Sequence, residues 1–370
     1  MFFASDNGSG AATEIMAAIQ RANEGYVRSY GSDPLTDRVR TLIRQTFEAP
    51  EAAVYLVATG TAANALSIAL YAQPWTAVFC HEEAHSALDE CGAPEFYSGA
   101  KLALVPGPHG KMTPETLRQA LGKVGESGVH GVQRGMLSLT NVTEAGTVYT
   151  PSEIAALTAL AKAKTLPCHL DGARLANALV ATGATAAEMT WKAGIDVVSF
   201  GGTKNGCMGV EAVVIFDPKK AWEFELRRKR GGHLFSKHRF LSAQMEAYLT
   251  DELWLRLATQ ANAMGKRIAD GLQTIPGTNL LHPADANILF LEWPAGTHLR
   301  AEEKGAIYYR WPAPAGREAA RLVASWSTTE QDADGLLAAL RHDSLLAFTL
   351  SDVVHGGQSG VKSAVVDTGV

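Results

Sequence analysis

The chain has 370 residues, of which 46% are hydrophobic, and its formal net charge is -5. This length exceeds one ordinary core and predicts a large domain with a smaller companion. The mildly acidic balance excludes a basic field of the kind that binds nucleic acid. The first residues lack a basic region followed by a sustained apolar run, so we expect no secretory leader, and no apolar stretch reaches membrane-spanning length. We therefore expect a cytoplasmic protein with no nucleic-acid partner and no membrane partner.

The first 250 residues alternate strand-like apolar runs with helical segments. These runs lie at residues 53–58, 77–80, 102–105, 136–139, 166–170 and 197–200. The alternation is typical of a parallel sheet, and the few polar positions in the runs predict helices on both faces. Residues 211–216 follow the last run too closely for a crossover helix, so we expect that strand to be antiparallel.

The pattern changes after residue 250. Residues 251–275 have apolar side chains at helical spacing and end at Pro276-Gly277, which predicts one long helix. Short strand-like runs and a last helix follow, at residues 287–293, 306–311, 320–326 and 330–340. We expect an α/β fold with a mostly parallel sheet covered by helices, and a smaller α+β C-terminal domain.

The expected domain boundaries follow from these changes of pattern. Residues 1–47 form an N-terminal arm and part of the small domain, and residues 48–250 form the large domain. Residues 251–342 form the small domain, and residues 343–370 are an appended tail with weak periodicity. The cysteines lack the spacing of a zinc site, so we expect reduced thiols and no metal centre.

A lysine is the strongest chemical signal. Lys204 lies in the stretch Gly201-Gly202-Thr203-Lys204-Asn205, directly after a predicted buried strand. Ligands of open α/β sheets bind at the carboxyl ends of strands, where a lysine forms a Schiff base if burial lowers its pKa. Asn205 stands where a P-loop needs Ser or Thr, which argues against a nucleotide loop. The alternative is an ordinary surface lysine.

Other predicted strand ends carry further candidates. Asp171 can keep a pyridine nitrogen protonated, and Arg174 can bind a carboxylate with two hydrogen bonds; the alternative is a helix-capping Asp beside an exposed Arg. His85 can stack on a pyridine ring, or it is a surface histidine. Helix N-terminal N–H groups bind phosphate, although a capped turn has the same sequence pattern; this candidate loop is Thr59, Gly60 and Thr61.

Taken in chain order, these motifs resemble those of fold-type-I pyridoxal 5′-phosphate (PLP) enzymes. They are most similar to the motifs of the low-specificity branch of the L-threonine aldolase family. The resemblance spans about residues 3–342. Beyond the motifs above it includes Ser5-Asp6, expected in a first strand, Tyr30-Gly31-Ser32-Asp33-Pro34 and Arg321-Leu322-Val323.

The resemblance implies a role for each motif. Lys204 would hold PLP, Asp171 would pair with its ring nitrogen, and His85 would stack above the ring. The loop at residues 59–61 would bind the phosphate. The substrate carboxylate would be bound by three side chains, those of Ser5, Arg174 and Arg321.

The family's assembly and reaction are implied in the same way. Its members work as homotetramers built from close dimers, in which Tyr30 would reach the site of a neighbouring subunit. The implied reaction cleaves L-threonine, L-allo-threonine and related β-hydroxy-α-amino acids reversibly to glycine and an aldehyde. Two alternatives remain: another PLP-dependent amino-acid lyase acting by β-elimination, and a catalytically silent binding protein of the same fold.

This chain departs from the family pattern at two places. Many members have a histidine after an Asn-Thr pair, but here the sequence is Asn141-Val142-Thr143-Glu144. The proton acceptor therefore stays open between a water near His85 and Thr143, His85 itself, and His130. The basic residue that meets the phosphate is also open. We select Lys237 for it, in competition with His238 and Arg239.

Overall fold

A computed structural model describes residues 1–341, and the tail expected at residues 343–370 lies outside the described residues. A seven-stranded sheet has the order β1-β7-β6-β5-β4-β2-β3. All its neighbouring pairs are parallel except those of β7. The strands are β1 (Ala53–Val57), β2 (Thr76–His81), β3 (Lys101–Val105), β4 (Gln133–Thr140), β5 (Cys168–Gly172), β6 (Val197–Gly201) and β7 (Glu211–Ile215).

The antiparallel entry of β7 is confirmed. β7 lies between β1 and β6 and pairs antiparallel with both. Only the nine residues 202–210 separate β6 from β7, and they contain only a short 3₁₀ helix, Thr203–Asn205, so no crossover helix connects the two strands.

Helices cover both faces of this sheet, as expected. Alternate residues of β1 enter different apolar clusters: Val54 and Leu56 pack in one, Tyr55 and Val57 in the other, because side chains of a strand alternate between its two faces. One face is covered by α3 (Gly60–Tyr71) and α10 (Ala221–Arg230). The other is covered by α2 (Pro34–Thr46), α6 (Pro114–Gly122), α7 (Pro151–Lys162), α8 (Leu175–Thr182) and α11 (Arg239–Leu249).

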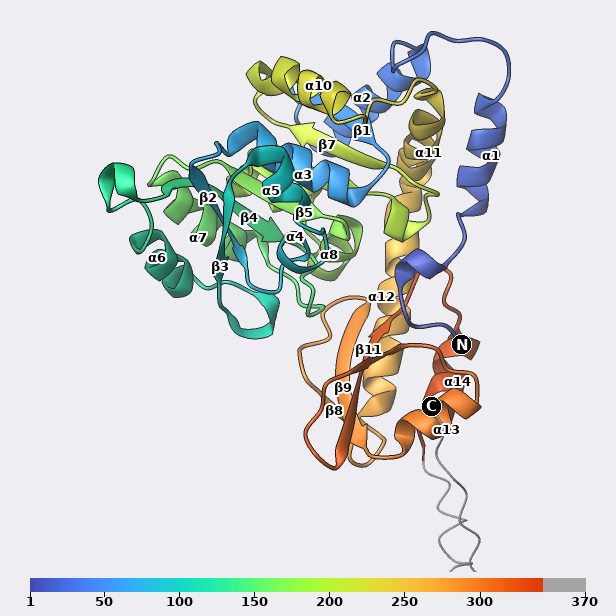
Figure 1. Cartoon of the computed structure of the whole chain (residues 1–370). Coiled ribbons are helices and arrows are strands. Elements are labelled where there is room, and N and C mark those ends of the chain that lie inside the picture. The colour runs from blue at the N-terminus through green and yellow to red at the C-terminus, as the bar shows by residue number, and fades with distance from the viewer. Residues whose placement is uncertain (342–370) are drawn as a thin grey trace, which may run out of the picture.

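A second, antiparallel sheet lies beside the long helix α12 (Leu253–Leu272) (Figure 1). Its order is β10-β11-β9-β8, with β8 (Asn279–Leu280), β9 (Ile288–Pro294), β10 (Tyr309–Trp311) and β11 (Arg317–Val323). Trp293 is fully buried in its separate core. The helices α13 (Thr297–Glu303) and α14 (Glu330–Leu340) complete this part, and α14 has the bounds that the sequence predicts.

The N-terminal arm divides between the two parts of the molecule. Phe3 packs in the core of the small sheet, and its N–H donates to the carbonyl of Ile307 at 2.7 Å. By contrast, α1 (Thr13–Ala22) and α2 pack against α11 (Figure 1). The chain between Phe3 and α1 therefore passes from one sheet to the other.

Three local predictions need correction. Ser5 and Asp6 are not in a strand, since residues Asp6–Gly8 form a 3₁₀ helix and the first strand is β1. The long helix begins at Leu253, because residues 250–252 form a 3₁₀ turn in which Asp251 and Glu252 have positive φ. Residues 306–311 were expected to form one strand, but only Tyr309–Trp311 (β10) joins the sheet. Ile307 instead forms an isolated parallel bridge with Phe2.

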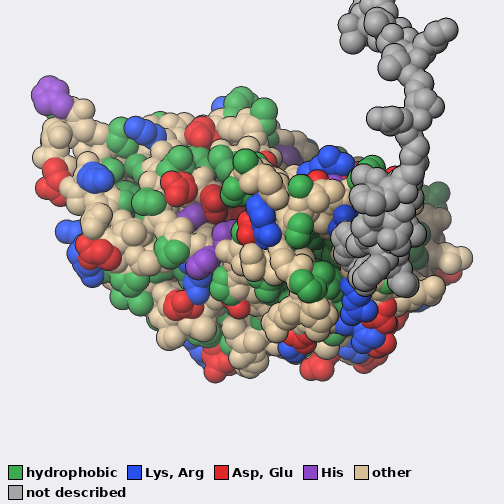
Figure 2. All heavy atoms as spheres, turned by 90° about the horizontal axis from the view of Figure 1, so that it is seen from below, with side chains coloured by type: hydrophobic (Ala, Val, Ile, Leu, Met, Phe, Trp, Pro, Cys, Tyr) green, Lys and Arg blue, Asp and Glu red, His purple; other side chains and the backbone are tan. Residues whose placement is uncertain are grey.

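The surface carries charges of both signs, as the small formal net charge of -5 leads us to expect. On the face drawn in Figure 2, acidic and basic side chains are interspersed with apolar ones. Within residues 1–341 no helix has the length and apolar character needed to cross a membrane.

Candidate active site

The predicted functional residues gather at one edge of the large sheet. Asp171 is the second-to-last residue of β5, and Lys204 follows β6 by three residues. His85 follows β2, and residues 59–61 follow β1. Because these strands run in the same direction, their carboxyl ends share an edge, which is where α/β sheets bind ligands.

The loop that carries Lys204 is held by its neighbours in sequence. The buried Glu211 side chain accepts hydrogen bonds from Gly202 N at 2.8 Å and Thr203 Oγ1 at 2.5 Å. Asn205 donates to the Tyr248 hydroxyl at 2.8 Å. The Lys204 ammonium itself has no hydrogen bond or ion pair within residues 1–341. The loop is therefore fixed while its lysine stays available.

Burial lowers the pKa of Lys204, and the nearby positive charge of Arg174 lowers it further. The carboxylates of Asp6, Asp171 and Glu211 oppose this shift without reversing it. A lysine with a lowered pKa has more of the uncharged amine, which is the nucleophilic form.

Asp171 is buried, with 6% of its surface exposed, and both its oxygens are held. Oδ2 accepts from Asn64 Nδ2 at 2.8 Å, and Oδ1 accepts from Ala173 N at 3.0 Å. Each carboxylate oxygen has a second lone pair. A third donor, such as a protonated ring nitrogen, can therefore bind an already oriented carboxylate.

Arg174 forms a two-point ion pair with Asp6. Its Nε and Nη2 donate to the Asp6 carboxylate at 2.6 and 2.9 Å, and both side chains are buried. Burial by itself would raise the pKa of Asp6, but Arg174 outweighs it and the pKa is lowered. The sequence indicated Asp6 only as part of a motif. Its role as the partner of Arg174 was missed.

Arg321 on β11 belongs to the same group of charges. Its Nη1 donates a long hydrogen bond, 3.4 Å, to the carbonyl of Ala4. Burial and the nearby charge of Arg174 together lower its pKa to about 10, while the charge of Asp6 opposes the shift. Asp6 pairs with Arg174, whereas Arg321 forms no ion pair within residues 1–341, so the positive charge of Arg321 is available to an anionic ligand. Nearby, Ser5 Oγ accepts from Asn7 N at 3.1 Å, and within residues 1–341 the Ser5 hydroxyl donates to no other group, so its proton is available to a ligand.

The candidate phosphate loop is the N-terminus of the twelve-residue helix α3. Thr59 caps the helix by accepting from Ala62 N at 3.2 Å. A Cβ added to Gly60 would meet no protein atom within 4 Å. The chain therefore leaves open space at a point where free N–H groups favour an anion.

The basic residues considered for the phosphate differ in their environment. Arg239 donates to the carbonyls of Glu24 and Gly25 at 3.2 and 3.1 Å. His238 is buried, and burial lowers its pKa to about 4, so it is uncharged at neutral pH. Lys237 is exposed and forms no hydrogen bond or ion pair within residues 1–341. Of the three, Lys237 is therefore the cation least committed elsewhere.

His85 begins the short helix α4 (His85–Leu88) and is held at two points. Its backbone N–H donates to Glu144 Oε1 at 2.6 Å, and its ring Nδ1 lies 3.0 Å from Glu90 Oε1. The hydrogen bond to Glu90 is the largest cause of the raised pKa of His85. Both carboxylates escaped the sequence analysis.

Glu144 stands near the place where relatives have a histidine, and that departure was the signal that could have identified it. Its Oε2 is buried and has no hydrogen-bond partner within residues 1–341. Burial raises the pKa of Glu144 to about 7, although the bond from His85 N opposes the shift. The site thus contains a carboxyl group that titrates near neutral pH.

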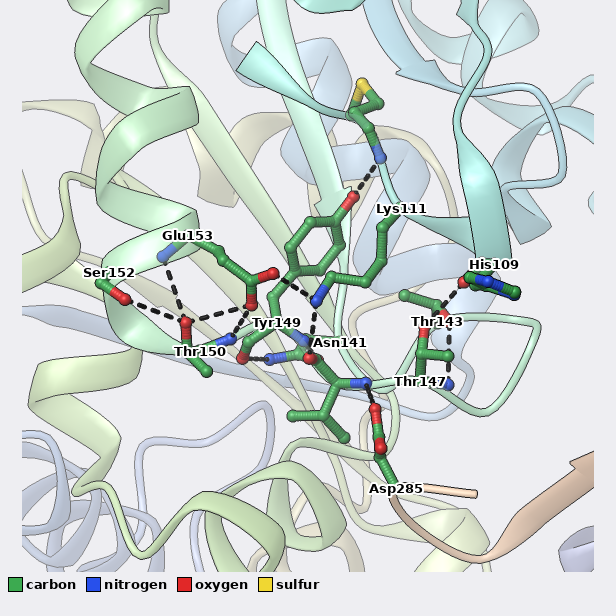
Figure 3. Close-up of polar contacts among 12 residues, drawn as sticks. His109, Lys111, Asn141, Thr143, Thr147, Tyr149, Thr150, Ser152, Glu153 and Asp285 are labelled. Atoms are coloured by element: carbon green, nitrogen blue, oxygen red, sulfur yellow. Dashed lines mark hydrogen bonds and ion pairs between the residues drawn. The ribbon is translucent and has the colours of Figure 1, made fainter. Parts of the chain in front are cut away.

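The loop that presents Glu144 is braced on its other side (Figure 3). Asn141 and Tyr149 exchange two hydrogen bonds of 3.0 Å across its base. Thr147 bonds Thr143 at 2.8 Å and the carbonyl of His109 at 2.7 Å. Asp285, just before β9, accepts from the N–H of residue 148 at 3.0 Å. The small sheet therefore helps to position this loop.

One candidate for the proton acceptor lies elsewhere. His130 is exposed at the end of a 3₁₀ helix, Gly128–His130, that precedes β4. It is thus at the amino end of that strand, whereas Asp171 is at the carboxyl end of its parallel neighbour β5. His130 therefore lies away from the other candidate residues.

Tyr30 lies on the outer surface of the chain, between α1 and α2. It has a positive φ of 59° and 46% of its surface is exposed. Lys229 Nζ lies 5.0 Å from the centroid of the Tyr30 ring. The backbone N–H of Tyr30 donates to the carbonyl of Ser236 at 3.0 Å. These contacts hold the backbone but leave much of the ring uncovered.

The fold and the site are those of a PLP-dependent lyase, and the comparisons with known proteins agree. The family described as beta-eliminating lyase matches residues 3–294, so the chain belongs to that family. Within it, a low specificity L-threonine aldolase of Pseudomonas sp. (strain NCIMB 10558) is 41% identical over 340 residues, which cover 92% of this chain and 96% of that protein. The corresponding protein of Pseudomonas aeruginosa is 42% identical, with 88% and 93% covered. The chain is a member of the low-specificity L-threonine aldolase family.

Solved structures agree with this family membership. Threonine aldolase of Leishmania major superposes with a TM-score of 0.87 at 29% identity, covering 92% of this chain and 98% of that one. Serine palmitoyltransferase of Sphingomonas wittichii has a TM-score of 0.67 at 16% identity, covering 92% and 86%, which shows the fold alone. The fold-type-I architecture with a smaller antiparallel sheet is thereby confirmed.

Proposed function

We propose that this protein is a PLP-dependent aldolase that cleaves L-threonine, L-allo-threonine and related β-hydroxy-α-amino acids reversibly to glycine and an aldehyde. The observation that carries the proposal is the position of buried Lys204 within reach of the charges of Asp171 and Arg174, with Arg321 in turn close enough to Arg174 to feel its charge. An amine, a ring-nitrogen partner and a carboxylate clamp thus lie at one edge of the sheet.

The residues present fit PLP. The lowered pKa of Lys204 favours the nucleophilic amine, and Asp171 has lone pairs free for a protonated ring nitrogen. The open space at Gly60 and the N-terminus of α3 suit a phosphate, with Lys237 as the accompanying cation. Bound PLP supplies an electron sink for the electron pair released when the substrate's Cα–Cβ bond breaks.

Arg174 and Arg321 bind the substrate carboxylate, and Ser5 donates its hydroxyl proton to the same group. A guanidinium forms two parallel hydrogen bonds with a carboxylate, so this contact fixes orientation as well as position. Orientation matters because the bond aligned with the electron sink is the one that breaks. The clamp therefore selects cleavage between Cα and Cβ.

Cleavage also requires that the β-hydroxyl loses its proton. Because His130 lies away from the site, the candidates are His85 and a water near His85 and Thr143. Thr143 Oγ1 is already bonded to Thr147 at 2.8 Å, whereas the His85 side chain is 37% exposed. His85 is therefore the better placed acceptor, and it would also be the side chain that stacks on the cofactor ring.

β-Elimination is the second candidate, because the matching family is described by that reaction. The two reactions give different products: an aldolase yields glycine and an aldehyde, whereas elimination yields ammonia and a keto acid. Purified enzyme supplied with PLP should convert L-threonine, L-allo-threonine and phenylserine to glycine and the matching aldehyde. Ammonia and a keto acid from these substrates would establish elimination instead, and no turnover would favour a silent binding protein.

We also propose a homotetramer of close dimers in the cytoplasm, in which Tyr30 completes the site of a neighbouring subunit. The exposed ring of Tyr30 on a held backbone supports this role. We propose a large domain at residues 48–250 and a small domain from residue 251, which the two separate apolar cores support. The first residues of α12, Leu253, Trp254 and Ala258, nevertheless pack in the core of the large sheet.

A further inference from the structure

A line of hydrogen bonds connects His85 with Asp171 through two buried side chains. His85 Nδ1 lies 3.0 Å from Glu90 Oε1, and Asn64 Nδ2 donates to that same oxygen at 2.9 Å. Asn64 Nδ2 also donates to Asp171 Oδ2 at 2.8 Å. The Glu90 side chain is completely buried, and Asn64 is 3% exposed.

The chemistry of these groups determines where the protons lie. An amide nitrogen has two protons, and Asn64 directs one to each carboxylate. A carboxylate only accepts hydrogen bonds, so the contact with Glu90 requires that the proton lies on Nδ1 of His85. A neutral imidazole carries one proton, and its other nitrogen, Nε2, then has a free lone pair.

We propose that Glu90 is a positioning residue that holds neutral His85 as the Nδ1–H tautomer and thereby leaves Nε2 as the proton acceptor of the active site. Asn64 fixes the carboxylate of Glu90 and ties its position to that of Asp171. The same arrangement of a carboxylate behind an imidazole sets tautomer and orientation in hydrolytic triads. The proposal rests on the proposed aldolase function only for the identity of the proton donor, which is the substrate hydroxyl.

The other charged groups around His85 do not provide this control. Glu144 contacts only its backbone N–H, at 2.6 Å, and so holds the residue without touching the ring. Lys204 lowers the pKa of His85, and Asp171 raises it through charge alone. Among these neighbours Glu90 is the one bonded to the ring.

The first test uses the unaltered holoenzyme. Nitrogen NMR on enzyme labelled with ¹⁵N-histidine distinguishes the two neutral tautomers, and His85→Asn identifies the signal among the eleven histidines of the chain. We expect Nδ1 protonated and Nε2 unprotonated above the pKa of His85. A neutral His85 with its proton on Nε2 would overturn the proposal, whether or not the enzyme cleaves threonine.

The second test is Glu90→Gln, which keeps the size of the side chain but removes its charge. We expect His85 to titrate at lower pH, because the largest cause of its raised pKa is removed. In the pH profile of kcat, the acid limb should move to lower pH together with the titration of His85. Loss of a hydrogen bond to a charged group predicts a fall in kcat of roughly tenfold to a hundredfold, with little change in KM.

Glu82→Gln is the matched control, since Glu82 is an exposed carboxylate in the same loop after β2. It should leave the His85 titration and the acid limb where they are. If Glu90→Gln also leaves both unchanged, Glu90 does not position His85. A fall in thermal stability without either shift would likewise contradict the proposal, because it would show a purely structural role.

Discussion

Asp6 and Arg174 lie 168 positions apart in the chain, yet they form a two-point ion pair. The pair joins the N-terminal arm to the end of β5. Asn287, directly before β9 of the small sheet, also donates to Asp6 at 3.2 Å. One buried carboxylate therefore connects the arm and both sheets.

Replacing Asp6 with Asn should destabilise the protein and weaken catalysis. Loss of one partner of a buried ion pair costs about 3–5 kcal/mol, because the remaining charge stays buried and unpaired. Arg174 also loses its orientation, so kcat/KM should fall. Thermal melting and steady-state kinetics measure the two effects. Asp37→Asn breaks only an exposed pair with Arg40 and serves as the control.

The same pair predicts a pH dependence of stability. The folded pKa of Asp6 is depressed, so its contribution is complete above the unfolded pKa of about 3.9 and is lost as pH falls through the folded value. Urea unfolding from pH 6 down to pH 3 should therefore show a steeper acid loss in the unaltered protein than in Asp6→Asn. Equal acid dependence of the two would contradict this assignment.

Lys204→Ala should abolish aldol cleavage and the covalent capture of PLP. Borohydride reduction of the unaltered holoenzyme should attach the cofactor to Lys204, and mass spectrometry locates the adduct. Within residues 1–341 Lys204 is the lysine whose pKa is lowered by burial, so no other amine should replace it. Undiminished capture in the variant would remove Lys204 from its role.

Asp171→Asn should retain PLP but lose turnover. A neutral amide does not stabilise a protonated ring nitrogen as a carboxylate does, so the electron sink is weakened. The PLP content of the purified variant, measured by absorbance, separates loss of binding from loss of chemistry. A kcat equal to that of the unaltered enzyme would show that Asp171 is not the ring partner.

Arg321→Lys should lower kcat/KM by roughly tenfold to a hundredfold, the effect of losing a charge-assisted hydrogen bond. An ammonium keeps the charge but not the planar two-point contact with a carboxylate. The absorbance of bound PLP should not change. If kinetics stay constant and only the melting temperature falls, Arg321 is a structural contact between β11 and the N-terminal arm.

Mixing two impaired variants tests the shared site. Lys204→Ala and Tyr30→Ala subunits should each be impaired, but their hybrids contain sites with an intact Lys204 from one subunit and an intact Tyr30 from the other. Activity should therefore return after the subunits are exchanged. Persistent inactivity of hybrids proven by mass spectrometry would show that Tyr30 serves its own subunit.

The sequence by itself determined the class of fold and the edge at which chemistry occurs. Apolar runs of strand length set the parallel strands, and the short connection before Glu211 required an antiparallel strand. The sequence indicated Lys204, Asp171 and His85 because each lies at or just after the end of a strand, and the carboxyl ends of parallel strands meet. These are local signals that do not depend on the order of strands in the sheet.

Tertiary structure alone decided which side chains pair. Arg174 meets Asp6, and His85 meets Glu90 and Glu144. His130 was a candidate by residue type, but the direction of β4 puts it at the opposite edge. Hydrogen bonds depend on positions within a few tenths of an ångström. Those positions are set by packing between elements distant in sequence, which no local pattern of residues encodes.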